Sequence, residues 1–369
     1  MNATNQAFFV LLKAGLWNRE PEHDCFPLSP EEWKQVYLLA QKQTVDGIIL
    51  DGILRLPQPF FPPRELLLQW MVRINAIENK NKQMDIVTTE LYRLFTKNNL
   101  HIYLIKGQGV AACYPAPSHR MSGDIDWYFP DKHQFDSACN LIQSSGLSVG
   151  KQAKFSKYYI WRGFLIEHHR RLLDLDNPLI SHYVHKLIQQ EDKNSIYLQL
   201  NEMSVRMPSP LLTHVLVNAH ILKHLLTSGI GVRQLCDSAR VCYTYRHSIE
   251  ADKLQQVYRK TGIYHWIQLV NNLLVNYLGM SEDCLPFPLD RKPQEAERLI
   301  LDIMTSGNFG HYGGPLTAST DSPHTKQNMF RRWLERCIRY FRYVRYAPLE
   351  ASWNPVVVVY SHIRNLFIR

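Results

Sequence analysis

Two aspartates at the start of a strongly apolar segment constrain this chain more than any other feature. Asp124 and Asp126 are separated by one isoleucine and followed directly by three aromatic residues at 127–129. Such a run is typical of a β-strand, on which side chains two residues apart point to the same face. We therefore expect the two carboxylates to lie side by side. Carboxylates held that close repel each other unless a cation lies between them, and Mg²⁺ readily binds one or two carboxylates together with phosphate oxygens.

The residues before this strand predict a second strand and a turn that suits a ligand. Residues 101–105 form an apolar segment that ends at Lys106 and Gly107. A glycine at this point lets the backbone approach a ligand closely. Residues 108–113 can begin a short helix, whose first amide groups favour anions. The expected order is strand, glycine turn, short helix, loop and then the strand with the two aspartates.

This arrangement is similar to the nucleotidyltransferase fold of the DNA polymerase β superfamily. The longer pattern resembles a bacterial family of mostly uncharacterised nucleotidyltransferases, which carries Lys-Gly, Tyr-Pro-X-Pro, Arg and Asp-Ile-Asp. The matching residues here are Lys106, Gly107, Tyr114, Pro115, Pro117, Arg120, Asp124, Ile125 and Asp126. One position departs from the wider superfamily, because Gln108 replaces the small Ser or Gly that follows the first glycine. This weakens any role for a hydroxyl there in holding the triphosphate.

The resemblance implies an α+β protein with a nucleotidyltransferase-like mixed sheet domain at residues 96–205. Helical regions at 1–95 and 206–369 would flank it. The implied activity is the metal-dependent transfer of a nucleoside monophosphate from a nucleoside triphosphate, ATP or another, to a hydroxyl acceptor, with two Mg²⁺ ions. The acceptor could be a small molecule, a protein or RNA. The competing hypothesis is an inactive nucleotidyltransferase-like domain that binds nucleotide, nucleic acid or a protein partner without turnover.

The resemblance also implies roles for particular residues. The catalytic and metal-binding residues would be Asp124, Asp126 and Glu167, and the nucleotide-binding residues would be Lys106, Gly107, Gln108 and Arg120. Glu167 lies on the second strand of a hairpin expected at 158–169, and it shares one face of that strand with His169. The alternative for Glu167 is a surface salt bridge with Arg170 or Arg171.

Three further residues are candidates for a supporting role around the site: His169, His220 and Arg233. His220 and His224 lie four residues apart on a helix expected at 211–226, a spacing that could bind zinc. Packing against the catalytic domain is the simpler interpretation. For Arg233, contact with substrate and a structural pair with Asp237 at helical spacing remain equally open.

The composition and the cysteines indicate where in the cell this protein is expected to be. The chain of 369 residues contains no run of 18 apolar residues, so it predicts no transmembrane helix, and its first residues make a poor signal peptide. Seven scattered cysteines, an odd number without a Cys-X-X-Cys pair, predict reduced thiols. We therefore expect a cytoplasmic protein.

Positive charge gathers towards the C-terminal end. The net charge is +9, and residues 326–345 combine Lys and Arg with interleaved aromatic residues. Such a segment could bind single-stranded nucleic acid or an anionic membrane surface. The commoner alternative is a helix that packs its aromatic side chains inward and exposes its arginines.

Overall fold

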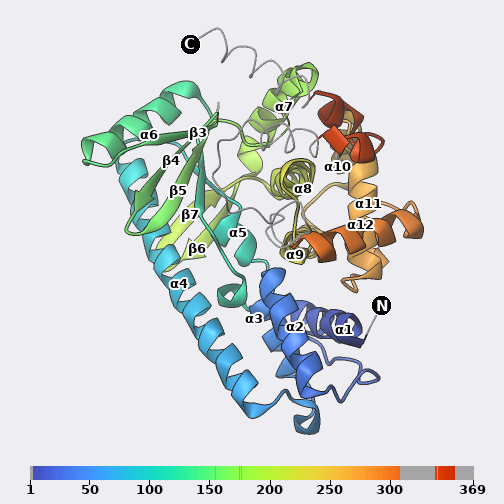
Figure 1. The fold of residues 1–369 in the computed structure, drawn as a ribbon. Helices are drawn as coiled ribbons and strands as arrows, with labels where there is room; N and C mark the ends of the chain where they lie inside the picture. The colour runs from blue at the N-terminus through green and yellow to red at the C-terminus, as the bar shows by residue number, and fades with distance from the viewer. Residues whose placement is uncertain are drawn as a thin grey trace, which may run out of the picture. The chain divides into compact units, whose positions relative to one another are not determined.

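The computed structural model describes residues 3–153, 155–173, 175, 177–307, 337, 338 and 340–353. The chain divides into two compact units (Figure 1). The first comprises residues 1–172, 191–214 and 239–244, and the second comprises 173–190, 215–238 and 245–369. The N-terminal helices therefore belong to the same unit as the sheet.

Four helices precede the sheet. They are α1 (Ala3–Trp17), α2 (Pro30–Lys42), α3 (Asp46–Ile53) and α4 (Arg64–Lys97), with a short 3-10 turn at Gln58–Phe60. Ser29 caps α2, and Glu32 completes a capping box with it. Helix α4 runs without interruption from Arg64 to Lys97.

Helices α1 and α3 approach each other closely because glycines lie at their crossing. A Cβ atom added at Gly15 would lie 1.8 Å from the carbonyl oxygen of Ile48. One added at Gly52 would lie 2.2 Å from the carbonyl oxygen of Leu11. Both neighbours are backbone atoms, so any larger residue would force the helices apart.

A five-stranded mixed sheet forms the centre of the first unit and confirms the predicted α+β class. Its strands are β1 (Tyr103–Ile105), β2 (Ile125–Tyr128), β3 (Gly150–Ala153), β4 (Ser156–Trp161) and β5 (Phe164–His169). The spatial order is β1-β2-β5-β4-β3. Strand β2 pairs with β5 in parallel, and every other pair is antiparallel. The hairpin expected at 158–169 is confirmed by β4 and β5.

The two faces of this sheet have different chemistry. One face packs on α4 and on α6 (Lys132–Ser144), which lie on the same side of the sheet (Figure 1). Trp127 and Ile166 are fully buried there. His168 also points to this face, where its Nε2 lies 3.1 Å from the Tyr159 hydroxyl. Complete burial lowers the pKa of His168 to about 3, so this imidazole is a neutral core residue.

A short helix and a second hairpin complete the first unit. Helix α5 (Gly107–Ala111) follows β1, and a 3-10 turn at Pro117–His119 precedes β2. Strands β6 (Ile196–Leu200) and β7 (Met203–Met207) form a separate antiparallel hairpin. Val205 and Met207 of β7 join the core between the sheet and α4.

The remaining elements are helical. They are α7 (Pro178–Glu191), α8 (Pro210–Thr227), α9 (Val232–Tyr245), α10 (Ala251–Lys260), α11 (Tyr264–Asn276) and α12 (Pro293–Ser306), with 3-10 turns at Asp192–Asn194 and Glu282–Cys284. Helix α8 confirms the helix expected at 211–226. In the second unit the Trp266 indole of α11 donates to the Asn218 carbonyl of α8 at 2.9 Å. Among the described helices, none is both long and apolar enough to cross a bilayer.

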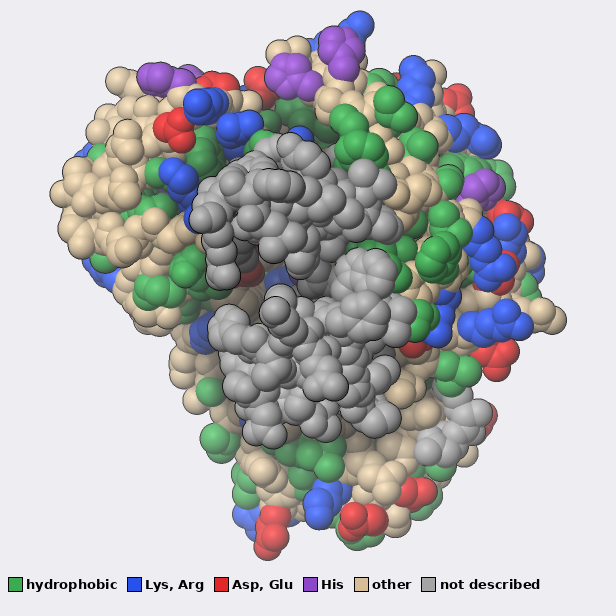
Figure 2. All heavy atoms as spheres, turned by 45° about the horizontal axis from the view of Figure 1, so that its top comes forward, with side chains coloured by type: hydrophobic (Ala, Val, Ile, Leu, Met, Phe, Trp, Pro, Cys, Tyr) green, Lys and Arg blue, Asp and Glu red, His purple; other side chains and the backbone are tan. Residues whose placement is uncertain are grey.

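The basic segment at 326–345 lies mostly outside the described residues. Two of its arginines are described, and each forms an ion pair with α12. Arg342 lies 3.5 Å from Asp302, and Arg345 lies 3.4 Å from Glu295. On the face drawn in Figure 2, the described Lys and Arg side chains are interspersed with Asp and Glu. Whether the segment binds nucleic acid therefore stays a prediction.

Candidate functional site

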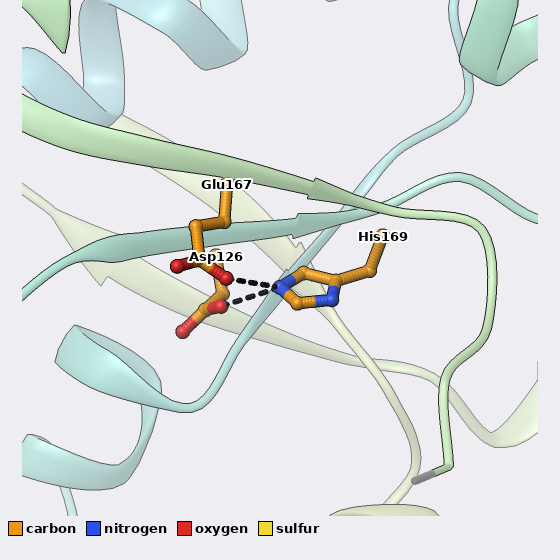
Figure 3. A group of neighbouring side chains, drawn as sticks. All are labelled: Asp126, Glu167 and His169. Atoms are coloured by element: carbon orange, nitrogen blue, oxygen red, sulfur yellow. Dashed lines mark hydrogen bonds and ion pairs between the residues drawn. The ribbon is translucent and has the colours of Figure 1, made fainter. Parts of the chain in front are cut away.

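The polar face of the sheet brings three chemically active side chains together (Figure 3). Asp126 of β2 lies opposite Glu167 of β5, and Tyr128 lies opposite His169 in the same parallel register. Side chains two residues apart share a face, so Asp126, Glu167 and His169 point to the same side. Asp126 and Glu167 are buried, with 2% and 8% of their surface exposed.

Two nitrogen donors contact the Asp126 carboxylate. The Nε2 atom of His169 lies 2.6 Å from Asp126 Oδ1 and 3.3 Å from Glu167 Oε2. The Lys106 ammonium donates to the same Asp126 oxygen at 3.2 Å. The Lys106 ammonium therefore lies against Asp126, and the His169 imidazole lies against both carboxylates, in a site that is largely shielded from water.

Opposing effects set the protonation of His169. Burial lowers its pKa, and the nearby Lys106 ammonium lowers it further. The hydrogen bonds to Asp126 and Glu167 outweigh both effects, so the pKa of His169 lies above its ordinary value.

The donor set fits a divalent cation. Within the described residues, one group of at least three His, Cys, Asp or Glu side chains has ligand atoms within 4.8 Å of one another, and it consists of Asp126, Glu167 and His169. Carboxylate oxygens suit Mg²⁺ and Mn²⁺, and imidazole nitrogen suits transition metals. This chemistry makes the group a candidate metal centre.

An unusual turn brings Lys106 to the site. Lys106 has φ 55° and ψ −141°, and Gly107 follows with φ 37°. A positive φ is costly for a residue with a side chain, and such strain is concentrated at functional sites. A Cβ atom on Gly107 would lie 3.3 Å from the Asp124 carbonyl oxygen, so glycine allows this turn to pack against the chain entering β2.

Asp124 occupies a different position from Asp126. It directly precedes β2, is half-buried, and is not a member of the three-residue group. Two aspartates lie side by side on one face only if both belong to the strand. Strand β2 begins at Ile125, so Asp126 belongs to it and Asp124 does not. Its role as a metal ligand stays a prediction.

Gln108 and Arg120 contact the protein interior. The Gln108 side chain is buried and donates to the Asp85 carboxylate of α4. Arg120 is also buried, and its guanidinium donates to the Ser122 hydroxyl at 3.1 Å. The Arg120 carbonyl accepts a 2.9 Å hydrogen bond from Asn81 of α4. Both residues thus fasten the segments around the site to α4, and contact with nucleotide stays a prediction for both.

His220 and Arg233 belong to the second unit and have partners within it. The Nε2 atoms of His220 and His224 lie 3.0 Å apart, but no third metal-binding side chain joins them among the described residues. Arg233 forms a 3.5 Å ion pair with Asp237, as the structural alternative anticipated. A supporting role in catalysis stays a prediction for both residues.

The sequence placed His169 in a supporting role, whereas the structure brings it into direct contact with both carboxylates. The alternation of Glu167 and His169 on one strand already contained this signal. The pairing of β5 with β2 was needed to show that the imidazole reaches Asp126 as well.

A small mixed sheet with buried carboxylates on adjacent strands defines the class of the first unit, an α+β domain with a candidate metal centre. A family model described as uncharacterised nucleotidyltransferase matches residues 29–279, which is more than half of the chain. The chain therefore belongs to this nucleotidyltransferase family. The expected resemblance is confirmed, and membership assigns the chain to the transferases.

Comparison with solved structures and curated proteins adds little to this assignment. The chain is similar to the crystal structure of an antigenic nucleotidyltransferase-like protein from Paracoccidioides brasiliensis. The two are 14% identical, the match covers 53% of this chain and 92% of that chain, and the TM-score is 0.32. No curated protein matches the chain.

Proposed function

We propose that this protein transfers a nucleoside monophosphate from a nucleoside triphosphate to a hydroxyl acceptor, in a reaction that depends on Mg²⁺. The observation that carries the proposal is the buried pair of Asp126 and Glu167 on adjacent parallel strands, in a chain of a nucleotidyltransferase family. Buried carboxylates repel each other, and a shared cation relieves that repulsion.

Each residue has a part in this reaction. Asp126 and Glu167 would hold the metal, and Asp124 would add a third carboxylate from the chain entering β2. When bound, Mg²⁺ neutralises the charge of the triphosphate and lowers the pKa of the attacking hydroxyl. Lys106 would turn from Asp126 towards the phosphates. Gly107 would let the backbone approach them, because no side chain stands in the way.

The transfer itself needs few covalent steps. The acceptor oxygen attacks the α-phosphorus, the bond from that phosphorus to the bridging oxygen breaks, and pyrophosphate leaves. The hydroxyl proton passes to a nearby base, and acting as this base is the alternative role for Glu167 to completing the metal site. Position and charge neutralisation supply most of the rate in such reactions.

The first experiment measures nucleotide binding and pyrophosphate release in the same samples. Each of the four ribonucleoside triphosphates is titrated by calorimetry with and without Mg²⁺. We expect binding that requires Mg²⁺ and disappears in Asp126→Asn. Glu202→Gln is the control, because it removes an exposed carboxylate from the β6–β7 turn. Equal activity in Asp126→Asn and the control would refute the mechanism.

The competing function is a nucleotidyltransferase-like domain that binds a partner without turnover. It is favoured by the contacts of Lys106 with Asp126 and of His169 with both Asp126 and Glu167, which bring basic side chains to the carboxylates without a metal. It predicts nucleotide binding that is the same with and without Mg²⁺, and no pyrophosphate release for any nucleotide.

A further inference from the structure

We propose that His169 is a direct ligand of the metal ion at this site, and that its nitrogen makes the site prefer Mn²⁺ to Mg²⁺. This inference rests on the proposed function, because it concerns the same metal centre. His169 would then bind the metal itself, and would not only hold the carboxylates in place.

The separations between the donor atoms fit a shared ion. His169 Nε2 lies 2.6 Å from Asp126 Oδ1 and 3.3 Å from Glu167 Oε2. An octahedral ion with bonds of about 2.1 Å separates neighbouring ligands by about 3.0 Å. The two observed separations lie on either side of this value, and the ligand atoms of all three residues lie within 4.8 Å of one another, so side-chain shifts would bring them to one ion.

The backbone directs His169 to this place. Glu167 and His169 alternate on β5, and the register pairs them with Asp126 and Tyr128 of β2. The neighbouring histidine, His168, points to the opposite face, where it is fully buried and contacts the Tyr159 hydroxyl. The imidazole of His169 therefore faces the carboxylates because of the strand pairing.

A nitrogen ligand changes which metal is preferred. Mg²⁺ favours oxygen ligands and keeps much of its water, whereas imidazole binds transition metals well. Mn²⁺ accepts both carboxylate oxygen and imidazole nitrogen, and it has nearly the size and geometry of Mg²⁺ in such sites. A site of two carboxylates and one imidazole is therefore expected to bind Mn²⁺ more tightly.

The test uses Mn²⁺ as the probe and the full chain as the protein. Pulsed electron paramagnetic resonance detects a nitrogen nucleus bonded to Mn²⁺, and labelling histidine with ¹⁵N identifies the source. Competition with Mg²⁺, followed by the free Mn²⁺ signal, gives the ratio of the two dissociation constants. The variant is His169→Gln, whose amide can still donate to the carboxylates but offers oxygen to a metal. The control is His133→Gln, an exposed histidine of α6.

We expect a histidine nitrogen signal in the wild type and in His133→Gln, and its loss in His169→Gln. The affinity for Mn²⁺ should fall by about tenfold or more in His169→Gln, since loss of even an outer partner costs about that much. The affinity for Mg²⁺, which favours oxygen ligands, should change less, so the preference for Mn²⁺ should fall. Bound Mn²⁺ without a nitrogen signal, or a signal that persists in His169→Gln, would overturn this inference and leave the proposed function standing. Failure of the wild type to bind either ion would overturn both.

Discussion

Replacing Asp126 by asparagine tests how the charges at the site balance. The substitution keeps the shape of the side chain and removes one negative charge. The charge is attracted by Lys106 at 3.2 Å and by protonated His169 at 2.6 Å. It is repelled by Glu167, whose ligand oxygen lies within 4.8 Å. The sign of the change in stability depends on which of these interactions is larger.

Coulomb's law gives the comparison. With an effective dielectric constant of about 20, the attraction is about 5 kcal/mol from Lys106 and about 6 kcal/mol from His169. The repulsion from Glu167 at the outer limit of 4.8 Å is about 3.5 kcal/mol on the same scale. Attraction prevails, but desolvation offsets most of it. A charged hydrogen bond is worth about 1.5–3 kcal/mol net, so we expect Asp126→Asn to lower the free energy of unfolding by about 2–3 kcal/mol.

The assay is urea unfolding near pH 6 with a chelator present, so that bound metal does not contribute. Glu202→Gln is again the control. Asp124→Asn should lower stability less, because Asp124 is half-buried and lies outside the three-residue group. We expect Asp124→Asn and Asp126→Asn both to abolish transfer while each still unfolds cooperatively. An Asp126→Asn protein more stable than the wild type would refute the reasoning, since carboxylate repulsion would then exceed the pairing.

Two other predictions concern the helices that support the site. Gly52→Ala should lower the free energy of unfolding by about 1–3 kcal/mol, because the new Cβ would overlap the Leu11 carbonyl oxygen; an unchanged urea midpoint would show that the helices separate freely. His119 lies 2.7 Å from Asp51 and 3.1 Å from Glu78. The hydrogen bond to Asp51 raises the pKa of His119 despite burial, so its stabilisation is complete below about pH 6.5 and is lost as pH rises through the folded pKa. In unfolding experiments, the stability advantage of the wild type over His119→Gln should therefore shrink between about pH 6 and about pH 8. An advantage that grows over this range would contradict the assignment. If residues 326–345 bind single-stranded nucleic acid, affinity should fall steeply with salt, by about 0.7 log units per log unit of salt for each contacted phosphate.

Local signals in the sequence were enough to predict many elements of this fold. The hairpin at 158–169 and the helix at 211–226 are both present where the residues indicated. Local capping residues also mark other helix ends, since Ser29 and Glu32 form a capping box at the start of α2, and α6 begins after the Asp131 cap and ends just before Gly146. Each of these features depends on residues a few positions apart, so periodicity and capping chemistry are sufficient to find them.

The contacts around the candidate site were harder to predict. Gln108 and Arg120 carry groups that suit a phosphate, yet both side chains bond to neighbours in the protein interior. Nothing near Gln108 in the sequence reveals Asp85, which lies 23 residues earlier. Polar side chains buried by tertiary packing need partners, and those partners come from whichever element packs beside them.

The sequence by itself determined the chemical repertoire of this protein, with carboxylates at Asp124, Asp126 and Glu167 and a glycine turn after the first strand. The tertiary structure decided which of them meet. Strands β2 and β5 are direct neighbours in the sheet although β3 and β4 lie between them in the sequence, and their register places Asp126 beside Glu167 and within reach of His169. Pairing between distant strands depends on how their faces pack against α4 and α6, because a shift of one residue would turn every side chain to the other face.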